Sequence, residues 1–276
     1  AGRVRGRATR ASAALRMRLL AFALLAAALG YAALCVAMLL GQRQLLYMPG
    51  ATRAPATSTD FVLERDDAAL RGWRIGPEDG RPLLYFGGNA ERIEGNRADF
   101  ARWFPGHRVY LLAYRGYGAS DGTPTAAAMK ADALALYDVV AAAHGGVGVD
   151  VIGRSVGSGV ASHVAAHRPV ARLALITPFD DLSRVARGHY PWLPVRALLR
   201  EHYTPAHDLA AFDGEVLILR ADRDTIVPPA HADALAAALP APPRVVAFAD
   251  AGHNDIQQFP GYSDALTGFF RSGRSD

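Results

Sequence analysis

From residue 61 onward, short apolar runs of strand length alternate with segments long enough for helices. Strands that alternate with helices in this way predict a mostly parallel sheet with helices on both faces, an α/β fold. We expect the strands at Phe61–Glu64, Ala69–Ile75, Leu83–Phe86, Arg108–Ala113, Val147–Ile152, Ala171–Ile176, Glu215–Leu219 and Arg244–Phe248. We expect the helices at Glu91–Phe104, Thr125–Ala143, Gly157–His167, Ala230–Leu239 and Asp255–Arg271.

Residues 178–212 interrupt the alternation. They include the sequence HYPWLP (189–194) and a segment with an amphipathic pattern, Val195–His202. The stretch is too long for a simple link between a strand and a helix. We therefore expect a short cap inserted over the carboxyl edge of the sheet, where open α/β sheets bind their ligands. The aromatic residues Tyr190 and Trp192 are candidate substrate-binding residues of this cap.

A separate apolar segment precedes the α/β pattern. Leu19–Gly41 has 23 residues without a charge, and at about 1.5 Å per residue it can cross a hydrocarbon core of about 30 Å. The apolar core of a cleaved signal peptide has only about 7–15 residues, and no convincing cleavage site follows here. The sequence therefore favours an uncleaved signal anchor over a cleaved signal. A buried core helix is disfavoured because the run has no polar face.

The basic charge of the chain is concentrated at its start. Six of the 30 basic residues are arginines within the first 18 positions, which leaves 24 basic against 26 acidic residues in the remainder. An arginine-rich arm before an apolar segment predicts a cytoplasmic amino terminus, with the body outside the cytoplasm, on the periplasmic side in a bacterium. We expect an arm at 1–18, a transmembrane anchor at 19–41 and a catalytic domain at 44–276, and no nucleic-acid partner.

Metal and thiol chemistry have no sequence signature here. Cys35 is the single cysteine and lies in the apolar segment, so it can neither form an intrachain disulfide nor act as a catalytic thiol of the body. The chain has no H-E-x-x-H motif, no cysteine pair and no G-x-G-x-x-G after a strand. We therefore expect neither a metal nor a cofactor.

The sequence Gly153-Arg154-Ser155-Val156-Gly157 matches G-x-S-x-G, the nucleophile elbow. In this motif a tight turn from strand to helix exposes the serine hydroxyl, and small flanking residues avoid clashes. An apolar strand precedes the motif and a helix follows it, as the elbow requires. A second match contains Ser120, but its strand ends several residues earlier and Thr-Pro follows. We interpret Ser120 as a loop serine and Ser155 as the candidate nucleophile.

A serine nucleophile requires a base, and the base requires an orienting acid. His253 follows the last expected strand, in agreement with the chain order serine, acid, histidine. The acid is expected just after Glu215–Leu219, where Asp222 and Asp224 both qualify and spacing alone does not choose between them. Asp250 is close to His253 in sequence and is interpreted as a loop-capping residue.

A tetrahedral intermediate also requires hydrogen-bond donors. The N–H of Val156, at the start of the helix after the elbow, is one candidate. The loop after Leu83–Phe86 reads Gly87-Gly88-Asn89-Ala90, and its two glycines permit a close approach of the backbone. We expect the N–H of Asn89 to be the second donor of the oxyanion hole.

Several ordered motifs extend this pattern from about residue 44 to residue 259: QRQLLYMPG, YFGGNAERI, AYRGYGASDGTP, VIGRSVGSGVA, TPFDDL, HYPWLPVRALL, LILRADRDTIVPPAHA and AGHNDI. Together they resemble the α/β-hydrolase superfamily, and within it the anchored α/β-hydrolase-domain subgroup of depalmitoylases and lysophospholipases. The resemblance selects Asp224 as the acid, because two residues separate the family carboxylate from the following Val-Pro. The chain departs from the family pattern at Gly87, where members usually carry histidine, and at Arg220-Ala221, where His-Gly is usual.

The resemblance implies a serine hydrolase that cleaves carboxylic ester or thioester bonds through an acyl-enzyme. The anchor and the aromatic cap indicate lipid or other acyl-chain substrates near a bilayer. One alternative is a serine peptidase of the aminopeptidase-like branch, for which the sequence shows no identifiable amine-binding carboxylate. Another is a non-catalytic binding protein of the same fold, which an intact set of Ser155, Asp224 and His253 argues against.

Overall fold

The computed structural model describes residues 2–271, with side chains from Leu15 onward. Residue 1 of the expected basic arm and residues 272–276 of the expected catalytic domain lie outside the described residues, as do the side chains of residues 2–14. In the described part, eight strands form one sheet in the order β1-β2-β4-β3-β5-β6-β7-β8. Strand β2 is antiparallel to both β1 and β4, and the remaining neighbours are parallel.

The observed strands follow the expected runs closely. Their bounds are β1 Phe61–Arg65, β2 Ala68–Ile75, β3 Arg81–Phe86, β4 His107–Leu112, β5 Val149–Arg154, β6 Val170–Ile176, β7 Glu215–Ala221 and β8 Arg244–Phe248. At the centre of the sheet the consecutive residues Val151 and Ile152 are both fully buried. Consecutive side chains point to opposite faces, so both faces are covered. The α/β fold class expected from the sequence is confirmed.

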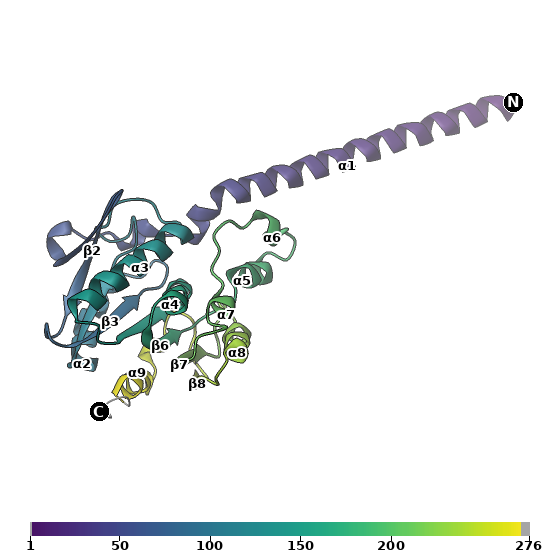
Figure 1. Cartoon of the computed structure of the whole chain (residues 1–276). Coiled ribbons are helices and arrows are strands. Elements are labelled where there is room, and N and C mark those ends of the chain that lie inside the picture. Colours follow the sequence, from purple (N-terminus) through teal and green to yellow (C-terminus); the bar gives the residue numbers. More distant parts are fainter. Residues whose placement is uncertain (1, 272–276) are drawn as a thin grey trace.

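The direction of the chain connections distributes the helices between the two faces (Figure 1). The chain moves one way along the sheet from β3 to β4, and reverses from β4 to β5. Because such crossovers are right-handed, α2 (Arg97–Trp103) and α3 (Ala126–Ala143) cover opposite faces. Helix α4 (Val156–His167) packs beside α3, whereas α9 (Tyr262–Arg271) contacts α2 through Trp103 and Tyr262, whose ring centroids are 5.9 Å apart. Helix α8 (Pro229–Ala238) joins β7 to β8.

Two expected helices are shorter than the sequence pattern suggested. Glu91–Phe104 contains a 3-10 turn, Ile93–Asn96, before α2 begins at residue 97, because the side chain of Glu91 turns back to bind the N–H of Gly88. The expected helix Asp255–Arg271 begins only at Tyr262. Pro260 and the positive φ of Gly261 (86°) interrupt the preceding turn.

The cap, residues 178–212, lies between β6 and β7 and contains three helices: α5 (Leu182–His189), α6 (Val195–Leu198) and α7 (Pro205–Asp208). Within the segment of amphipathic pattern, Val195–His202, only one helical turn forms before Leu199 adopts an extended conformation. The amphipathic helix of the cap is α5, which buries Val185 and exposes Arg184 and Arg187.

Helix α1 (Gly2–Leu46) projects away from the body, and its final turns lie beside the cap (Figure 1). An apolar window of this helix has a mean hydropathy of 2.4 and no burial against the body, so α1 is long and apolar enough to cross a membrane. At its base, Arg43 Nε donates to Glu201 Oε1 at 2.7 Å, and the hydroxyl of Tyr47 donates to Glu201 Oε2 at 3.0 Å. Glu201 is a buried carboxylate of the cap, so these contacts hold the end of α1 to the cap.

Candidate active site

Ser155 occupies a strained turn between β5 and α4. Its φ is 52° and its ψ −120°, a conformation that residues other than glycine rarely adopt. A Cβ at Gly153 would approach the carbonyl oxygen of Gly157 to 2.5 Å, and a Cβ at Gly157 would lie 2.1 Å from the carbonyl oxygen of Phe86. Both flanking positions therefore require glycine. The turn places Ser155 at the carboxyl end of β5 and at the amino end of α4.

The structure brings Ser155 together with two side chains that are distant in sequence. His253 Nε2 lies 2.8 Å from Ser155 Oγ, and His253 Nδ1 lies 2.6 Å from Asp224 Oδ2. Asp224 follows β7 and His253 follows β8, so all three side chains come from the carboxyl edge of parallel strands. His253 and Asp224 are both buried, whereas Ser155 is partly exposed.

The hydrogen bonds of Asp224 determine the direction of proton donation. Its Oδ1 accepts the N–H groups of Ile226 at 2.9 Å and Val227 at 2.7 Å, which leaves Oδ2 for the imidazole. An ionised carboxylate only accepts, so Nδ1 of His253 is the donor. In a neutral imidazole Nε2 then accepts from the Ser155 hydroxyl. This arrangement can remove the serine proton as the oxygen attacks an electrophile.

The competing residues of the sequence analysis have other partners. Asp222 Oδ1 accepts from Arg220 Nε at 2.8 Å, and Asp250 forms an exposed ion pair with Arg223 at 2.5 Å. Ser120 is buried, donates to the carbonyl oxygen of Ala113 at 2.8 Å and accepts from a backbone N–H, so its hydroxyl stabilises a loop.

The two expected oxyanion donors flank Ser155. Val156 is the first residue of α4. No carbonyl of the same helix lies four residues before it, so its N–H has no partner within the helix. Neither its N–H nor that of Asn89 donates to another of the described residues. The adjacent Gly88 lies against the serine, because a Cβ there would be 3.6 Å from Ser155 Cβ. The loop 87–90 and the start of α4 thus offer two N–H groups near the serine.

The side chain of Asn89 ties this loop to the end of α1. Its Nδ2 donates to the carbonyl oxygen of Leu46 at 2.7 Å. Its Oδ1 accepts from Met48 N at 3.0 Å and from the hydroxyl of Tyr117 at 2.7 Å. The chain segment that leaves α1 is therefore in direct contact with the candidate oxyanion loop.

A partly buried carboxylate, Glu91, which the sequence analysis did not single out, supports the same loop. Glu91 Oε2 accepts from Gly88 N at 2.6 Å, and Oε1 accepts from the hydroxyl of Tyr85 at 2.6 Å and from Asn96 Nδ2 at 2.8 Å. Burial raises the pKa of Tyr85 well above its usual value, so the phenol remains a donor. The only sequence signal was an acid three residues after Gly88.

Arg154, the variable residue of the elbow, links Glu91 to the histidine loop. Arg154 Nη1 lies 3.5 Å from Glu91 Oε2, and Nη2 donates to the carbonyl oxygen of His253 at 3.4 Å. Burial disfavours the charged guanidinium, but the Glu91 carboxylate together with Tyr85 and Tyr262 outweighs this effect, and the pKa of Arg154 is raised. Two loops of the site therefore share one partly buried ion pair.

The family that the sequence resembles usually has histidine at position 87. In this chain, a neighbouring side chain fills the space that a side chain at Gly87 would occupy. A Cβ at residue 87 would lie 2.5 Å from Ile93 Cγ2. The carbonyl oxygen of Gly87 accepts from the hydroxyl of Tyr114 at 3.0 Å, and burial keeps the pKa of that phenol well above its usual value. Tyr114 and Glu91 thus hold the loop from two sides.

The two candidate substrate-binding residues lie in the cap and not among the three convergent side chains. Tyr190 and Trp192 form an edge-to-face pair with ring centroids 6.2 Å apart. Tyr190 is 40% exposed and Trp192 is 53% exposed. Among the described residues, neither has a hydrogen bond or a ring contact with Ser155, Asp224 or His253. Their expected role in substrate binding stays a prediction.

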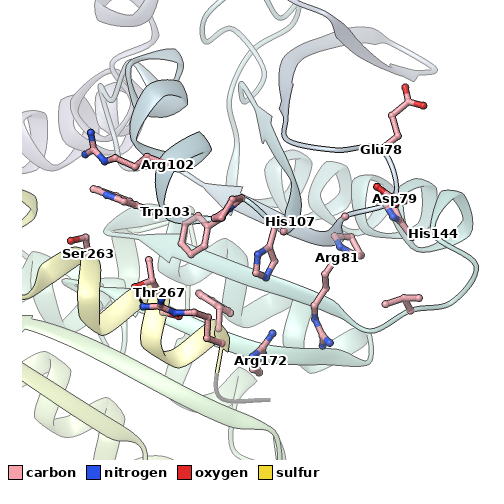
Figure 2. A pocket seen from close by; sticks show the side chains of 18 of the residues that line it. Glu78, Asp79, Arg81, Arg102, Trp103, His107, His144, Arg172, Ser263 and Thr267 are labelled. Carbon is pink, nitrogen blue, oxygen red and sulfur yellow. Dashed lines mark hydrogen bonds between the residues drawn. The ribbon is translucent and has the colours of Figure 1, made fainter. Parts of the chain in front are cut away.

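A cavity of about 850 Å³ lies elsewhere on the molecule, between the starts of β3 and β4. Figure 2 shows Arg81, His107 and Arg172 beside this cavity. Arg81 and Arg172 both donate to Asp150, which is fully buried. Because the strands begin here, the cavity is at the edge opposite Ser155, and Arg81 and Arg172 bind a structural carboxylate. Among the described residues, no group of three or more His, Cys, Asp or Glu side chains is placed to hold a metal ion.

Comparison with known proteins supports the α/β-hydrolase fold. A family model described as the alpha/beta hydrolase fold matches residues 81–202. An uncharacterised protein of Mycobacterium tuberculosis is 35% identical over 236 residues, which cover 80% of this chain and 83% of that protein. The lysophosphatidylserine lipase ABHD12 of Danio rerio is 30% identical over 167 residues, or 53% of this chain and 44% of the lipase. The match thus covers less than half of the lipase.

Solved structures resemble the fold at lower sequence identity. A hydrolase from Pseudomonas aeruginosa superposes with a TM-score of 0.61 and 21% identity, covering 76% of this chain and 98% of that chain. The Pyrococcus furiosus esterase Pf2001 gives a TM-score of 0.61 and 16% identity, covering 82% of this chain and 93% of the esterase. At such identities the likeness concerns the fold alone.

Proposed function

The chain belongs to the α/β-hydrolase superfamily, in its α/β-hydrolase-domain subgroup, and from that premise we propose that it is a serine hydrolase of acyl esters or thioesters. The observation that carries this proposal is the continuous series of hydrogen bonds from Asp224 through His253 to Ser155, with lengths of 2.6 and 2.8 Å. Ser155 is the nucleophile, His253 the general base and Asp224 the orienting acid.

The proposed reaction has two stages. Nε2 of His253 takes the proton of Ser155 as Oγ bonds to the carbonyl carbon of the substrate. The resulting oxyanion accepts hydrogen bonds from the N–H groups of Val156 and Asn89. Collapse of the tetrahedral intermediate breaks the bond between the former carbonyl carbon and the leaving alcohol or thiol. The leaving group takes the proton from His253. Water then repeats the sequence, releases the carboxylic acid and restores Ser155.

Glu91 is proposed as a positioning residue for the oxyanion loop. In Glu91→Ala the N–H of Gly88 and the guanidinium of Arg154 lose their acceptor, so the loop is free to shift. We expect kcat to fall by about 10- to 100-fold, because displacement of about 1 Å has this effect on catalysis, with KM little changed. Glu91→Gln retains an acceptor for Gly88 and should restore part of the rate.

Steady-state kinetics with a soluble p-nitrophenyl ester measures kcat and KM separately, and thermal unfolding checks that each variant is folded. Glu94→Ala is the matched control, since in the described part of the chain this acid pairs with the exposed Arg92 alone. Equal loss of kcat in the Glu91 and Glu94 variants, or an unchanged kcat in folded Glu91→Ala, would remove the positioning role.

The proposed substrates are acyl chains presented at a membrane. This rests on the apolar helix α1, on the contact between α1 and the oxyanion loop, and on the likeness to a lysophosphatidylserine lipase. We propose that residues 19–41 span the bilayer, with residues 1–18 in the cytoplasm and the domain 44–276 on the periplasmic side, because arginine residues precede the span. Neither a cofactor nor a nucleic acid has a role in this proposal.

A fluorophosphonate probe tests the assignment directly. Ser155 Oγ is expected to bond to phosphorus and displace fluoride, with His253 taking the proton. Mass spectrometry of the digested protein should locate the adduct on the peptide containing Ser155 and leave Ser120 unmodified. An adduct on another serine would contradict the site, and absence of any adduct on the folded protein would favour a non-catalytic binding protein. A membrane-impermeant probe applied to intact spheroplasts should label equally well if the domain is periplasmic.

A further inference from the structure

The cap touches α1 well inside its apolar segment. The hydroxyl of Tyr31 donates to the carbonyl oxygen of Trp192 at 2.8 Å. Further along, Gln42 Nε2 donates to the carbonyl oxygen of Leu198 at 3.1 Å, and Gln42 Oε1 accepts from Arg200 N at 2.7 Å. These contacts extend over three turns of α1, so the position of the cap along the helix axis is well defined.

The contact at Tyr31 places part of the cap at membrane depth. Tyr31 is ten residues before Gly41, or about 15 Å at about 1.5 Å per residue. That is about half of a hydrocarbon core of about 30 Å. Even a span of about 20 residues beginning at Leu19 would leave Tyr31 about 10 Å inside the core. If α1 crosses the membrane as proposed, Trp192 therefore lies below the headgroups.

A shift of α1 along the membrane normal that kept the cap in water would be unfavourable. A span of about 20 residues that ended at Tyr31 would draw Arg16 and Arg18 into the hydrocarbon core, where a charged guanidinium is strongly disfavoured. It would also place Val36 and Leu40 in water. These apolar residues are 54% and 75% exposed on α1, so little protein would shield them from that water. Insertion of the cap avoids both penalties.

The composition of the cap segment at this depth suits a bilayer. Residues 190–194, here termed the cap tip, read Tyr-Pro-Trp-Leu-Pro and contain no charge. The two prolines have no N–H to desolvate. Tryptophan and tyrosine are the residues enriched at membrane interfaces. A largely apolar groove of about 160 Å³ separates the cap tip from α1 and is lined by Met38, Leu45, Tyr190, Leu193 and Leu198, among others.

Unpaired cations flank the cap tip. Arg187 and Arg196 are exposed, as is Arg200, and none of the three has a carboxylate partner among the described residues. The nearby Arg184, in contrast, pairs with Asp180. An apolar aromatic segment bordered by free arginines is typical of surfaces that enter the interface of membranes containing anionic lipids.

We propose that the cap tip inserts into the bilayer beside α1, and that the groove between them holds an acyl chain of a lipid from the same leaflet. This inference rests on the proposed membrane span of α1. Both sides of the groove are connected to the candidate active site. His189, next to the cap tip, donates to the carbonyl oxygen of Ile226 in the Asp224 loop at 2.8 Å, and Leu46 accepts from Asn89. A chain in the groove would thus lie between the elements that hold the acid and the oxyanion loop.

Tryptophan fluorescence of the full chain in phosphatidylcholine–phosphatidylglycerol liposomes tests the insertion. Lipids brominated on the acyl chain quench only tryptophans at membrane depth, whereas acrylamide quenches those in water. We expect bromolipid to quench the part of the emission that Trp192→Phe removes, and acrylamide to leave that part unchanged. The part that Trp103→Phe removes should show no bromolipid quenching, because Trp103 lies in the body between Phe100 and Tyr262.

Two other results would overturn the inference, and they are distinguishable. If alkaline carbonate extracts the protein from the liposomes, α1 does not span the bilayer and the proposed insertion falls with it. If the protein resists carbonate but acrylamide quenches the Trp192 emission, α1 spans and the cap tip remains in water. Fluorophosphonate labelling of the same samples reports separately on the proposed hydrolase, because neither outcome depends on Ser155.

Discussion

Replacing Ser155 with alanine is expected to lower kcat for ester hydrolysis by about 10⁴- to 10⁶-fold, the range seen when the nucleophile of a serine triad is removed. The substitution removes the oxygen that His253 Nε2 approaches at 2.8 Å, so no acyl-enzyme can form. The methyl group fits the same turn, although its positive φ of 52° is retained. Residual activity then comes only from substrate binding and the oxyanion donors. Steady-state kinetics at enzyme concentrations high enough to resolve the background rate measures the loss.

Ser120→Ala is the matched control for this prediction. Ser120 is the other G-x-S-x-G serine, and its hydroxyl bonds to backbone groups of Arg71 and Ala113. Its loss should destabilise the fold by about 1–3 kcal/mol, because buried backbone groups lose a partner. The kcat of the folded fraction should stay close to that of the wild type. A Ser155→Ala enzyme with near-wild-type kcat would refute the site.

Asp224→Asn is expected to lower kcat by about 10⁴-fold through a change of tautomer, as in other triads. The position of the new amide group follows from the backbone. Oδ1 accepts two N–H groups, from Ile226 and Val227, so the amide oxygen must remain there. The NH₂ group then faces His253 Nδ1, which has to accept. Nε2 consequently carries the proton and can no longer accept one from Ser155.

The neighbouring Asp222 provides a control that changes the same chemical group. Asp222→Asn removes a carboxylate that pairs with the partly exposed Arg220, and its effect on kcat should be less than about twofold, since exposed pairs contribute little. Measurement of kcat for both variants, with circular dichroism to verify folding, separates the two acids. A larger loss in Asp222→Asn than in Asp224→Asn would reverse the assignment.

The elements of the sheet were predictable because their signals are local. Each strand is a short apolar run, and the observed bounds of β8, Arg244–Phe248, agree with the predicted ones residue by residue. Helix ends were less predictable, because they depend on contacts that are distant in sequence. The helix expected from Glu91 starts later since Glu91 is engaged by Gly88 and Tyr85. In the segment Val195–His202 the helix ends at Leu198, and Glu201 beyond it is held by Arg43 of α1.

The elbow could also be derived from the sequence, since two glycines at fixed spacing around a serine imply a tight turn. The distances between the three convergent side chains could be known only from the order of the strands in the sheet, because Ser155 and His253 are 98 residues apart in sequence. The resemblance selected Asp224 over Asp222. The roles of Glu91 and Arg154 had no signal beyond their neighbours in the chain, because a partly buried ion pair between two loops depends on how those loops pack.

The sequence by itself determined the α/β class, the strained serine turn and the presence of an apolar segment long enough to cross a membrane. Each of these depends on residues that are close together in the chain, so the backbone geometry and the hydropathy of a single segment are sufficient. The tertiary structure alone decided how α1 meets the body. The bond from Tyr31 to Trp192 joins residues 161 positions apart, and only packing can define such a contact.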